Sequence, residues 1–371
     1  MRHSIFLISA LCIYLLQLHA FTAWAESLDE DESSENNPSD ENALEHDSLP
    51  QHSRFQLDGS VYTLFSWQNT SPDFGFSLER ARIEVNWQIS KKLTSVVEAA
   101  LEDVTINGTP DDLLRDAYIR YALWSKLQLT VGQFKKPFSI FELTPRGKMP
   151  FIHRGISNAY LVRDLGYGGR DIGFQVGGVF ETPVKIHYAV GVFNGNGSNQ
   201  QESDGNGAKD FTGRIEVRTK KKLRTGLSFS WKNFDQNSPD NESKPISAWM
   251  MGVDVQLRIS GMRLMAEGVY GVNHAATEHP QAAAFHSVIS WKFHLPYRQM
   301  FVMPVARLDG IWPFFSDTQE THVHMGTAGI HWQIEKHLRV MLEYEITRSS
   351  KNLRNLWPNA NCVLFQLALD W

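Results

Sequence analysis

Cysteine is nearly absent from this 371-residue chain, which contains two. Cys12 falls in a leader-like stretch, so the processed chain keeps Cys362 alone and can form no internal disulfide. Nothing near Cys362 in the sequence looks like an activating base, so we expect a small buried residue there rather than a nucleophile. The scarcity of cysteine excludes a disulfide-stapled secreted fold.

Long apolar runs are also missing, and no stretch of about 18 apolar residues is available for a membrane-spanning helix. The N-terminus has a short basic start, a mostly apolar run from Ile5 to Leu18, and the small-x-small pattern Ala23-Trp24-Ala25. This order predicts a signal peptide over residues 1–25 and a mature chain that begins at Glu26, outside the cytoplasm.

Residues 26–50 lack Lys and Arg, contain almost nothing apolar, and include ten acidic residues. Such a segment cannot bury enough surface to offset the entropy of ordering it, so we expect it to be a disordered, solvated periplasmic tail. Removing its ten negative charges and the positive charge of Arg2 from the net charge of −5 leaves +4 on residues 51–371. A basic body therefore follows an acidic arm.

From Arg54 onward, apolar residues recur at every second position. Phe55, Leu57 and Val61 alternate with Gln56 and Asp58 in the first such segment. Successive side chains on a strand point to opposite faces, so each segment has one apolar and one polar face. The pattern predicts sixteen strands, at residues 54–68, 76–88, 93–102, 113–123, 126–134, 169–180, 184–193, 210–219, 223–233, 247–258, 262–273, 282–293, 300–311, 322–333, 338–348 and 361–371.

The connections between these strands alternate between tight turns and longer loops, which is typical of a transmembrane barrel. In lipid, only helices and closed barrels satisfy every backbone group. We therefore predict an all-β fold, a transmembrane antiparallel β-barrel of about 16 strands with short periplasmic turns, over residues 51–371. A soluble two-sheet sandwich is disfavoured because the apolar faces carry tryptophans near strand ends: Trp67, Trp87, Trp231, Trp249, Trp291, Trp332 and Trp371.

Three strands need comment. Val96 and Ala100 fall on the polar face of strand 93–102, and Pro304 lies inside strand 300–311, where it removes a hydrogen-bond donor. The sequence NCVLFQLALDW at 361–371 predicts a closing strand, which must pair with strand 54–68 to leave no edge in the bilayer. Its ending resembles the signal read by the barrel-assembly machinery.

The connection after the fifth strand, residues 134–168, is much longer than the others. In a barrel of this size we expect such a loop to fold into the lumen and narrow it. Charge at the narrowest point sets ion selectivity. Between Phe134 and Arg170 only Glu142 and Asp164 are acidic, which predicts a preference for anions; the seven cations are Lys135, Lys136, Arg146, Lys148, Arg154, Arg163 and Arg170. Alternatively, these cations pin the loop to wall carboxylates such as Asp116 or Glu98.

Several motifs together resemble the phosphate-selective porin O and P family over most of residues 55–371. They are ERARIEVNWQI (79–89), LRDAYIRYALW (114–124), LTVGQFKKPFS (129–139), GGRDIGFQVGG (168–178) and TAGIHWQIEKHLRVMLEYEITR (327–348). The resemblance implies a homotrimeric, sixteen-stranded outer-membrane channel that passes anions, with phosphate or polyphosphate as substrates. Its motifs place an arginine ladder at Arg80 and Arg82, and the constriction at Lys135 or Lys136 with Ser139.

The sequence thus predicts a porin of the Gram-negative outer membrane, with no enzymatic activity, cofactor or metal. Its expected partners are inorganic anions or small solutes, outer-membrane lipid, the barrel-assembly machinery and further copies of itself. The alternatives are a general porin for small hydrophilic solutes and, more remotely, an outer-membrane barrel enzyme or adhesin. The residues expected to line the anion path and constriction are Arg80, Arg82, Lys135, Lys136, Ser139, Arg146, Lys148, Arg154 and Arg170.

Other possible sites carry less weight. His322 and His324 share one face but lack a third metal ligand. His286 and Ser287 are adjacent on a strand, so they point to opposite faces and cannot form a nucleophile and base pair. The run from Lys220 to Lys222 is expected to be a basic periplasmic turn rather than a site for nucleic acid.

Overall fold

The computed structural model describes residues 54–102, 113–195, 197, 209–219, 222–236, 244–272, 281–296, 300–314 and 321–371. The predicted signal peptide (1–25) and acidic segment (26–50) lie outside these residues. Within the described part of the chain, no helix is long and apolar enough to cross a membrane.

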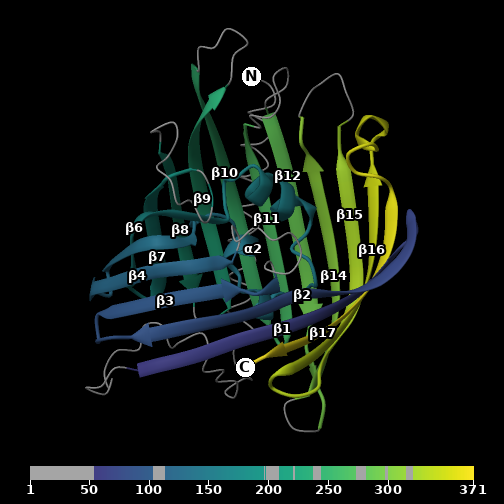
Figure 1. Cartoon of the computed structure of the whole chain (residues 1–371), viewed down its shortest axis with the longest axis horizontal. Helices are drawn as coiled ribbons and strands as arrows, with labels where there is room; N and C mark the ends of the chain where they lie inside the picture. The colour runs from purple at the N-terminus through teal and green to yellow at the C-terminus, as the bar shows by residue number, and fades with distance from the viewer. Residues whose placement is uncertain are drawn as a thin grey trace. The chain divides into compact units, whose positions relative to one another are not determined.

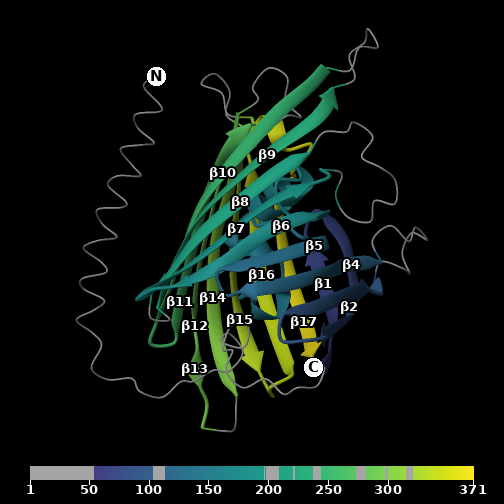
Figure 2. The ribbon, with the colours of Figure 1, turned by 90° about the vertical axis from the view of Figure 1, so that its left-hand side faces the viewer.

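The described residues form one antiparallel sheet of strands (Figures 1 and 2). The strands are β1 (Arg54–Gln68), β2 (Ser71–Gln88), β3 (Leu93–Ala100), β4 (Leu114–Trp124), β5 (Leu127–Lys135), β6 (Arg170–Glu181), β7 (Val184–Phe193), β8 (Asp210–Thr219), β9 (Leu223–Gln236), β10 (Lys244–Ile259), β11 (Met262–Val272), β12 (Gln281–Trp291), β13 (Phe293–His294), β14 (Phe301–Trp312), β15 (Val323–Gln333), β16 (Leu338–Ser349) and β17 (Ala360–Asp370). The short helices are α2 (Ile140–Leu143), η3 (Arg146–Lys148), η4 (Asn158–Asp164) and η5 (Lys351–Leu353).

The sheet closes on itself because β17 pairs with β1, from Ser60 opposite Asp370 to Gln68 opposite Cys362. Strands β12 and β13 are separated by Lys292 alone, and both pair with β14, so they act as one interrupted strand. Counted in this way the barrel has sixteen strands, which confirms the predicted number and the predicted closing pair.

The alternation of side chains explains why these residues form a barrel wall. On β1, Phe55 and Leu57 are 64% and 53% exposed, whereas Ser60 and Tyr62 are buried. Outward-facing apolar rows suit lipid, and inward-facing polar rows suit an aqueous interior. The tryptophans expected near strand ends are all exposed, as predicted: Trp67, Trp87, Trp231, Trp249, Trp291, Trp332 and Trp371.

The structure shows where the residues that fitted the pattern poorly lie. Val96 and Ala100 do occupy the buried, inner face of β3. Pro304 faces outward on β14, next to the interruption between β12 and β13, so its missing N–H falls where the strand ladder is already broken. The largest boundary error is in β2, which begins at Ser71, five residues earlier than predicted, because Ser71 pairs directly with Gln68 across a two-residue turn.

The connection between β5 and β6 packs against inward-facing side chains of the barrel wall. Phe141, Met149 and Phe151 of this connection pack against inward side chains such as Met265 of β11 and Val288 of β12. Further along, Leu161, Val162 and Tyr167 pack against the inner faces of β10, β11 and β12. This buried apolar surface holds the connection against the wall.

The outward rows give a direct test of the fold. Phe365 lies midway along β17 and is 42% exposed, so Phe365→Arg should destabilise the barrel by about 2–4 kcal/mol if this row faces lipid. The same change at Leu369, near the strand end, should cost about 0–1 kcal/mol. Urea unfolding of barrels folded into vesicles measures both, with Phe365→Leu as control. Equal costs at the two depths would contradict a lipid-facing row.

Candidate functional site

The connection between β5 and β6 is fixed first by a carboxylate of β11. Ser139 has a positive φ of 67° and caps α2, with its hydroxyl accepting a hydrogen bond from the Glu142 N–H (3.3 Å). The same hydroxyl donates to Glu267 Oε2 (2.7 Å), and the Ile140 N–H donates to Glu267 Oε1 (3.1 Å). Ser139 and Ile140 are fully buried, so Glu267 holds the start of α2 against the wall.

Lys136 is a second buried anchor. Its Nζ donates to the Gly166 carbonyl (2.5 Å) and lies 3.3 Å from Asp210 Oδ2 and 3.7 Å from Asp171 Oδ2. The residue is only 2% exposed. Its charge is therefore neutralised by carboxylates of β6 and β8.

Other wall residues hold the rest of the connection through its backbone. The carboxylate of Glu343 accepts a hydrogen bond from the Ile152 N–H (2.8 Å). The carboxylate of Asp309 accepts one from the Ser157 N–H (3.2 Å). Wall arginines donate to its carbonyls: Arg307 to His153 (2.6 Å), Arg339 to Gly147 (2.8 Å) and Arg263 to Lys148 (2.8 Å). These anchors lie on β11, β14 and β16.

Cations gather around Glu142 at the centre of the connection. Lys135 Nζ donates to the Glu142 carbonyl (2.6 Å) and lies 3.4 Å from its Oε1. Arg154 donates to the carbonyls of Phe141 and Thr144. Burial alone would raise the pKa of Glu142, but the four positive charges around it hold that pKa below its usual value: Lys135, Arg154, Arg163 and Arg170.

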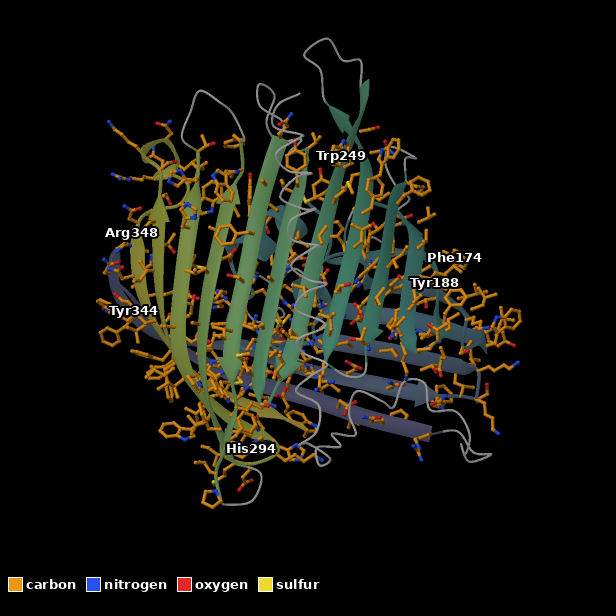
Figure 3. The ribbon with its side chains drawn as sticks, turned by 180° about the vertical axis from the view of Figure 1, so that it is seen from behind. Phe174, Tyr188, Trp249, His294, Tyr344 and Arg348 are labelled. Carbon is orange, nitrogen blue, oxygen red and sulfur yellow. The ribbon has the colours of Figure 1, made fainter. Side chains whose placement is uncertain are left out.

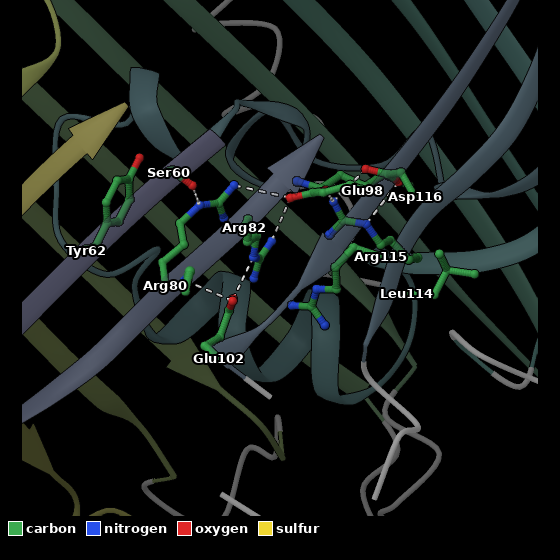
Figure 4. A network of polar contacts seen from close by, with 12 residues as sticks. Ser60, Tyr62, Arg80, Arg82, Glu98, Glu102, Leu114, Arg115 and Asp116 are labelled. Atoms are coloured by element: carbon green, nitrogen blue, oxygen red, sulfur yellow. Dashed lines mark hydrogen bonds and ion pairs between the residues drawn. The ribbon is translucent and has the colours of Figure 1, made fainter. Parts of the chain in front are cut away.

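A second polar network lines the inner face of β1 to β4 (Figure 4). Arg80 donates to Ser60 Oγ (2.6 Å) and lies 3.3 Å from Glu98. Arg82 pairs with the same Glu98 (3.1 Å) and with Glu102 (2.6 Å). Both arginines keep some exposure, 19% and 13% of the side chain, so they line the interior and are not sealed within it.

Arg170, at the start of β6, extends this network. It pairs with Asp116 (2.7 Å) and Glu98 (2.6 Å), the two wall carboxylates of the pinning alternative. Arg146 forms an ion pair with Glu79 of β2. Lys148 is exposed.

The chain is similar in sequence and in fold to known proteins. A family model described as phosphate-selective porin O and P matches residues 52–291, well over half of the chain. The chain belongs to this family. No curated protein matches it.

Solved porins share the barrel of this family member. The outer-membrane channel DcaP of Acinetobacter baumannii covers 86% of this chain and 98% of its own at 12% identity, with a TM-score of 0.61. OmpT, an outer-membrane protein of Vibrio cholerae described in a trimer form, covers 86% and 100% at 12% identity (TM-score 0.59). An anion-selective porin from Comamonas acidovorans covers 86% and 100% at 9% identity (TM-score 0.57). Identities this low show a common fold, and family and fold together indicate an outer-membrane porin rather than an enzyme.

In this member of the porin O and P family, the predicted site residues divide into separate groups. Lys135, Arg154 and Arg170 surround Glu142, and Arg170 is also joined to Arg80 and Arg82 through Glu98. Lys136 and Ser139 are buried among anchors, while Arg146 and Lys148 are the first and last residues of η3.

Sequence reasoning missed the carboxylates that hold the connection in this porin, namely Asp210, Glu267, Asp309 and Glu343. In the sequence, the only sign of these anchors is that each is an acidic residue on the polar face of a predicted strand. Residues that line a water-filled lumen give the same signal, so their role depends on which segment lies opposite.

The histidine candidates lie in different surroundings. The rings of His322 and His324 lie 5.0 Å apart, and the described residues contain no group of three or more His, Cys, Asp or Glu that could hold a metal. His286 is buried and stacks on Phe141, whereas Ser287 donates to the Leu308 carbonyl. The two residues are consecutive on β12 and lie on opposite faces of the strand, as predicted.

The buried lysine allows a stability test. Lys136→Met should destabilise the protein by about 3–5 kcal/mol, because Asp171 and Asp210 would lose a buried counter-charge. Lys91→Met removes the same charge from an exposed position in the turn between β2 and β3 and should change stability by less than about 0.5 kcal/mol. Urea unfolding of the folded barrel measures both. Equal effects would show that Lys136 is not an anchor.

Proposed function

We propose that this porin is a homotrimeric channel for passive diffusion of anions across the outer membrane, with phosphate or polyphosphate as cargo. The observation that carries the proposal is the group of cations at Glu142: Lys135 lies 3.4 Å from its carboxylate, and Arg154 donates to the carbonyls of Phe141 and Thr144 on either side of it. A surplus of positive charge at a narrow point raises the local concentration of anions and repels cations.

The pattern of anchors suggests where the ions pass. The connection is fixed to β8, β11, β14 and β16, and to Glu79 of β2 through Arg146. Arg80 and Arg82, also on the inner face of β2, instead pair with Glu98. We therefore infer that the path runs between Lys135 and Arg154 on one side and these two arginines on the other. Lys136 and Ser139 support this path as anchors and do not line it.

These side chains suit an oxyanion. A guanidinium offers several N–H donors in a fixed plane, and an ammonium offers three, so together they can replace part of the hydration shell of a phosphate. Charges act more strongly in a constriction than in open water because less solvent separates them. No covalent step is involved in such passage.

Assembly and location complete the proposal. The trimeric form of the OmpT neighbour and the family resemblance both support a homotrimer. We propose that residues 1–25 are a signal peptide, that residues 26–50 are a periplasmic tail, and that the barrel-assembly machinery inserts the barrel into outer-membrane lipid.

Planar-bilayer recording tests the function directly. In a tenfold KCl gradient, the zero-current potential should have the sign expected when chloride is more permeant than potassium. Its magnitude should not exceed about 59 mV, the value for a channel that passes chloride alone. Added phosphate should reduce the chloride current if it binds at the constriction. A potential with the sign of cation preference, or the absence of channels, would refute the proposal.

A general porin for small hydrophilic solutes is the second candidate. It is favoured by the mixed charge of the wall, where Glu98 contacts Arg80, Arg82 and Arg170. Such a porin would give a zero-current potential near zero and a chloride current insensitive to phosphate, so the same recordings discriminate the two.

A further inference from the structure

An arginine stands on the lipid-facing row of β16. The outward residues of this strand, Leu342, Tyr344 and Ile346, are 52%, 44% and 37% exposed, and the next outward position is Arg348 (Figure 3). The fully described strands β15 and β17 on either side contain no Lys or Arg. Arg348 is thus a single positive charge at the end of an apolar surface.

The guanidinium of Arg348 is held in place but keeps its charge. Nη1 donates to the carbonyls of Thr347 (2.8 Å) and Ala360 (3.1 Å), and Nη2 donates to Asn361 Oδ1 (3.0 Å). None of these acceptors is a carboxylate, and within the described part of the chain Arg348 forms no ion pair. An arginine has five N–H donors, so two remain for a ligand.

Two further cations follow on the connection between β16 and β17. Lys351 and Arg354 are exposed, and the chain has no acidic residue between Glu345 and Asp370. This connection is well anchored, because the Ser350 N–H donates to the His322 carbonyl (2.9 Å) and Leu353 is buried in the core. The three charges are therefore presented by ordered backbone.

Neighbouring aromatic residues indicate the depth of Arg348 in the membrane. His324 lies directly opposite Arg348 on β15, and its ring is 5.5 Å from that of Trp312 and 6.3 Å from that of Phe285. Aromatic side chains gather at membrane interfaces, and an arginine on a lipid-facing row is tolerated near the interface, not at mid-bilayer. Arg348 is also at the end of the barrel that bears the long connections, opposite the short turns.

We propose that Arg348, Lys351 and Arg354 bind the phosphate groups of the phosphorylated glycolipid that forms the outer leaflet. Arg348 contacts a headgroup phosphate with its remaining donors, and the acyl chains lie along Ile346, Tyr344 and Leu342. Charge-assisted bonds between guanidinium and phosphate are strong, and the apolar row below adds contact area. The proposal rests on the outer-membrane location and not on anion passage through the lumen.

The test compares two triple variants of the full-length protein purified in detergent. Arg348→Ala/Lys351→Ala/Arg354→Ala should bind diphosphorylated lipid A at least tenfold more weakly than the parent, as measured by native mass spectrometry. The control Lys91→Ala/Lys92→Ala/Lys336→Ala removes three charges from short turns and should bind as the parent does. Dephosphorylated lipid A should bind weakly to the parent and respond little to the first triple change.

Several outcomes would overturn the proposal. Unchanged lipid A binding in the first triple variant, or an equal loss in the control, would do so. Displacement of lipid A by millimolar inorganic phosphate would identify a site for free phosphate. Loss of the oligomer with lipid binding intact would instead assign this surface to a second copy.

The single variant Arg348→Gln controls for the possibility that the triple variant loses lipid binding because it misfolds. It retains hydrogen-bonding capacity but removes the charge, so weaker lipid binding with unchanged single-channel conductance is the expected result. Because conductance and lipid binding are measured separately, failure of this proposal is distinguishable from failure of the proposed anion passage.

Discussion

Replacing Lys135 and Arg154 together by glutamate is expected to reverse the ion preference of the channel. Each substitution changes the local charge by two units. One unit charge interacts with a monovalent ion about 6 Å away in water by about 0.7 kcal/mol, so a change of four unit charges amounts to about 3 kcal/mol. Salt screening reduces this effect, and we expect at least a tenfold fall in the permeability of chloride relative to potassium.

The zero-current potential in a KCl gradient measures this ratio and should change sign. Lys91→Glu/Lys92→Glu is the matched control, because it makes the same charge change in the turn between β2 and β3, far from the connection in sequence. Only a small shift is expected there. If the two double variants gave the same potential, the selectivity would arise from overall charge and not from the cluster around Glu142.

Replacing Glu267 by alanine is expected to release α2 from the wall. The variant would lose the acceptor for Ser139 Oγ and for the Ile140 N–H, and a typical intramolecular hydrogen bond contributes about 0.5–1.5 kcal/mol. The attachment would therefore weaken by about 1–3 kcal/mol. Single-channel conductance should become larger and noisier, and anion preference should fall.

Glu267→Gln provides the control for this experiment. The glutamine side chain has the same size and still offers an acceptor oxygen. The conductance of Glu267→Gln should therefore be closer to that of the parent protein than the conductance of Glu267→Ala. Limited proteolysis should cut Glu267→Ala within residues 136–169 while the barrel stays intact. Conductance and cleavage identical to the parent would show that other anchors, such as Glu343 and Asp309, suffice.

The strands could be predicted because their signal is local. The ranges predicted for β7 (184–193) and β8 (210–219) agree with the structure at both ends, since an apolar residue at every second position is visible without knowledge of any partner. Where turn residues interrupted the pattern, as at the start of β2, the prediction lost five residues.

The roles of individual charges could not be predicted in the same way. Lys135 and Lys136 are adjacent and chemically identical, yet the first side chain is 20% exposed and the second 2%. The difference arises from Asp210, which is distant in sequence and meets Lys136 only in the folded barrel. Of the site residues, sequence could therefore supply the candidates but not divide them into anchors and lining groups.

The anchors of the connection also bear on how the barrel folds. Ile140 and Glu267 are 127 residues apart in sequence, and Ile152 and Glu343 are 191 apart. Contacts of such separation form slowly, because a long loop must close before they can stabilise anything. Docking of the connection must therefore await the arrangement of β11 and β16. A nascent barrel would pass through a wide-bore, weakly selective stage before it becomes a mature channel.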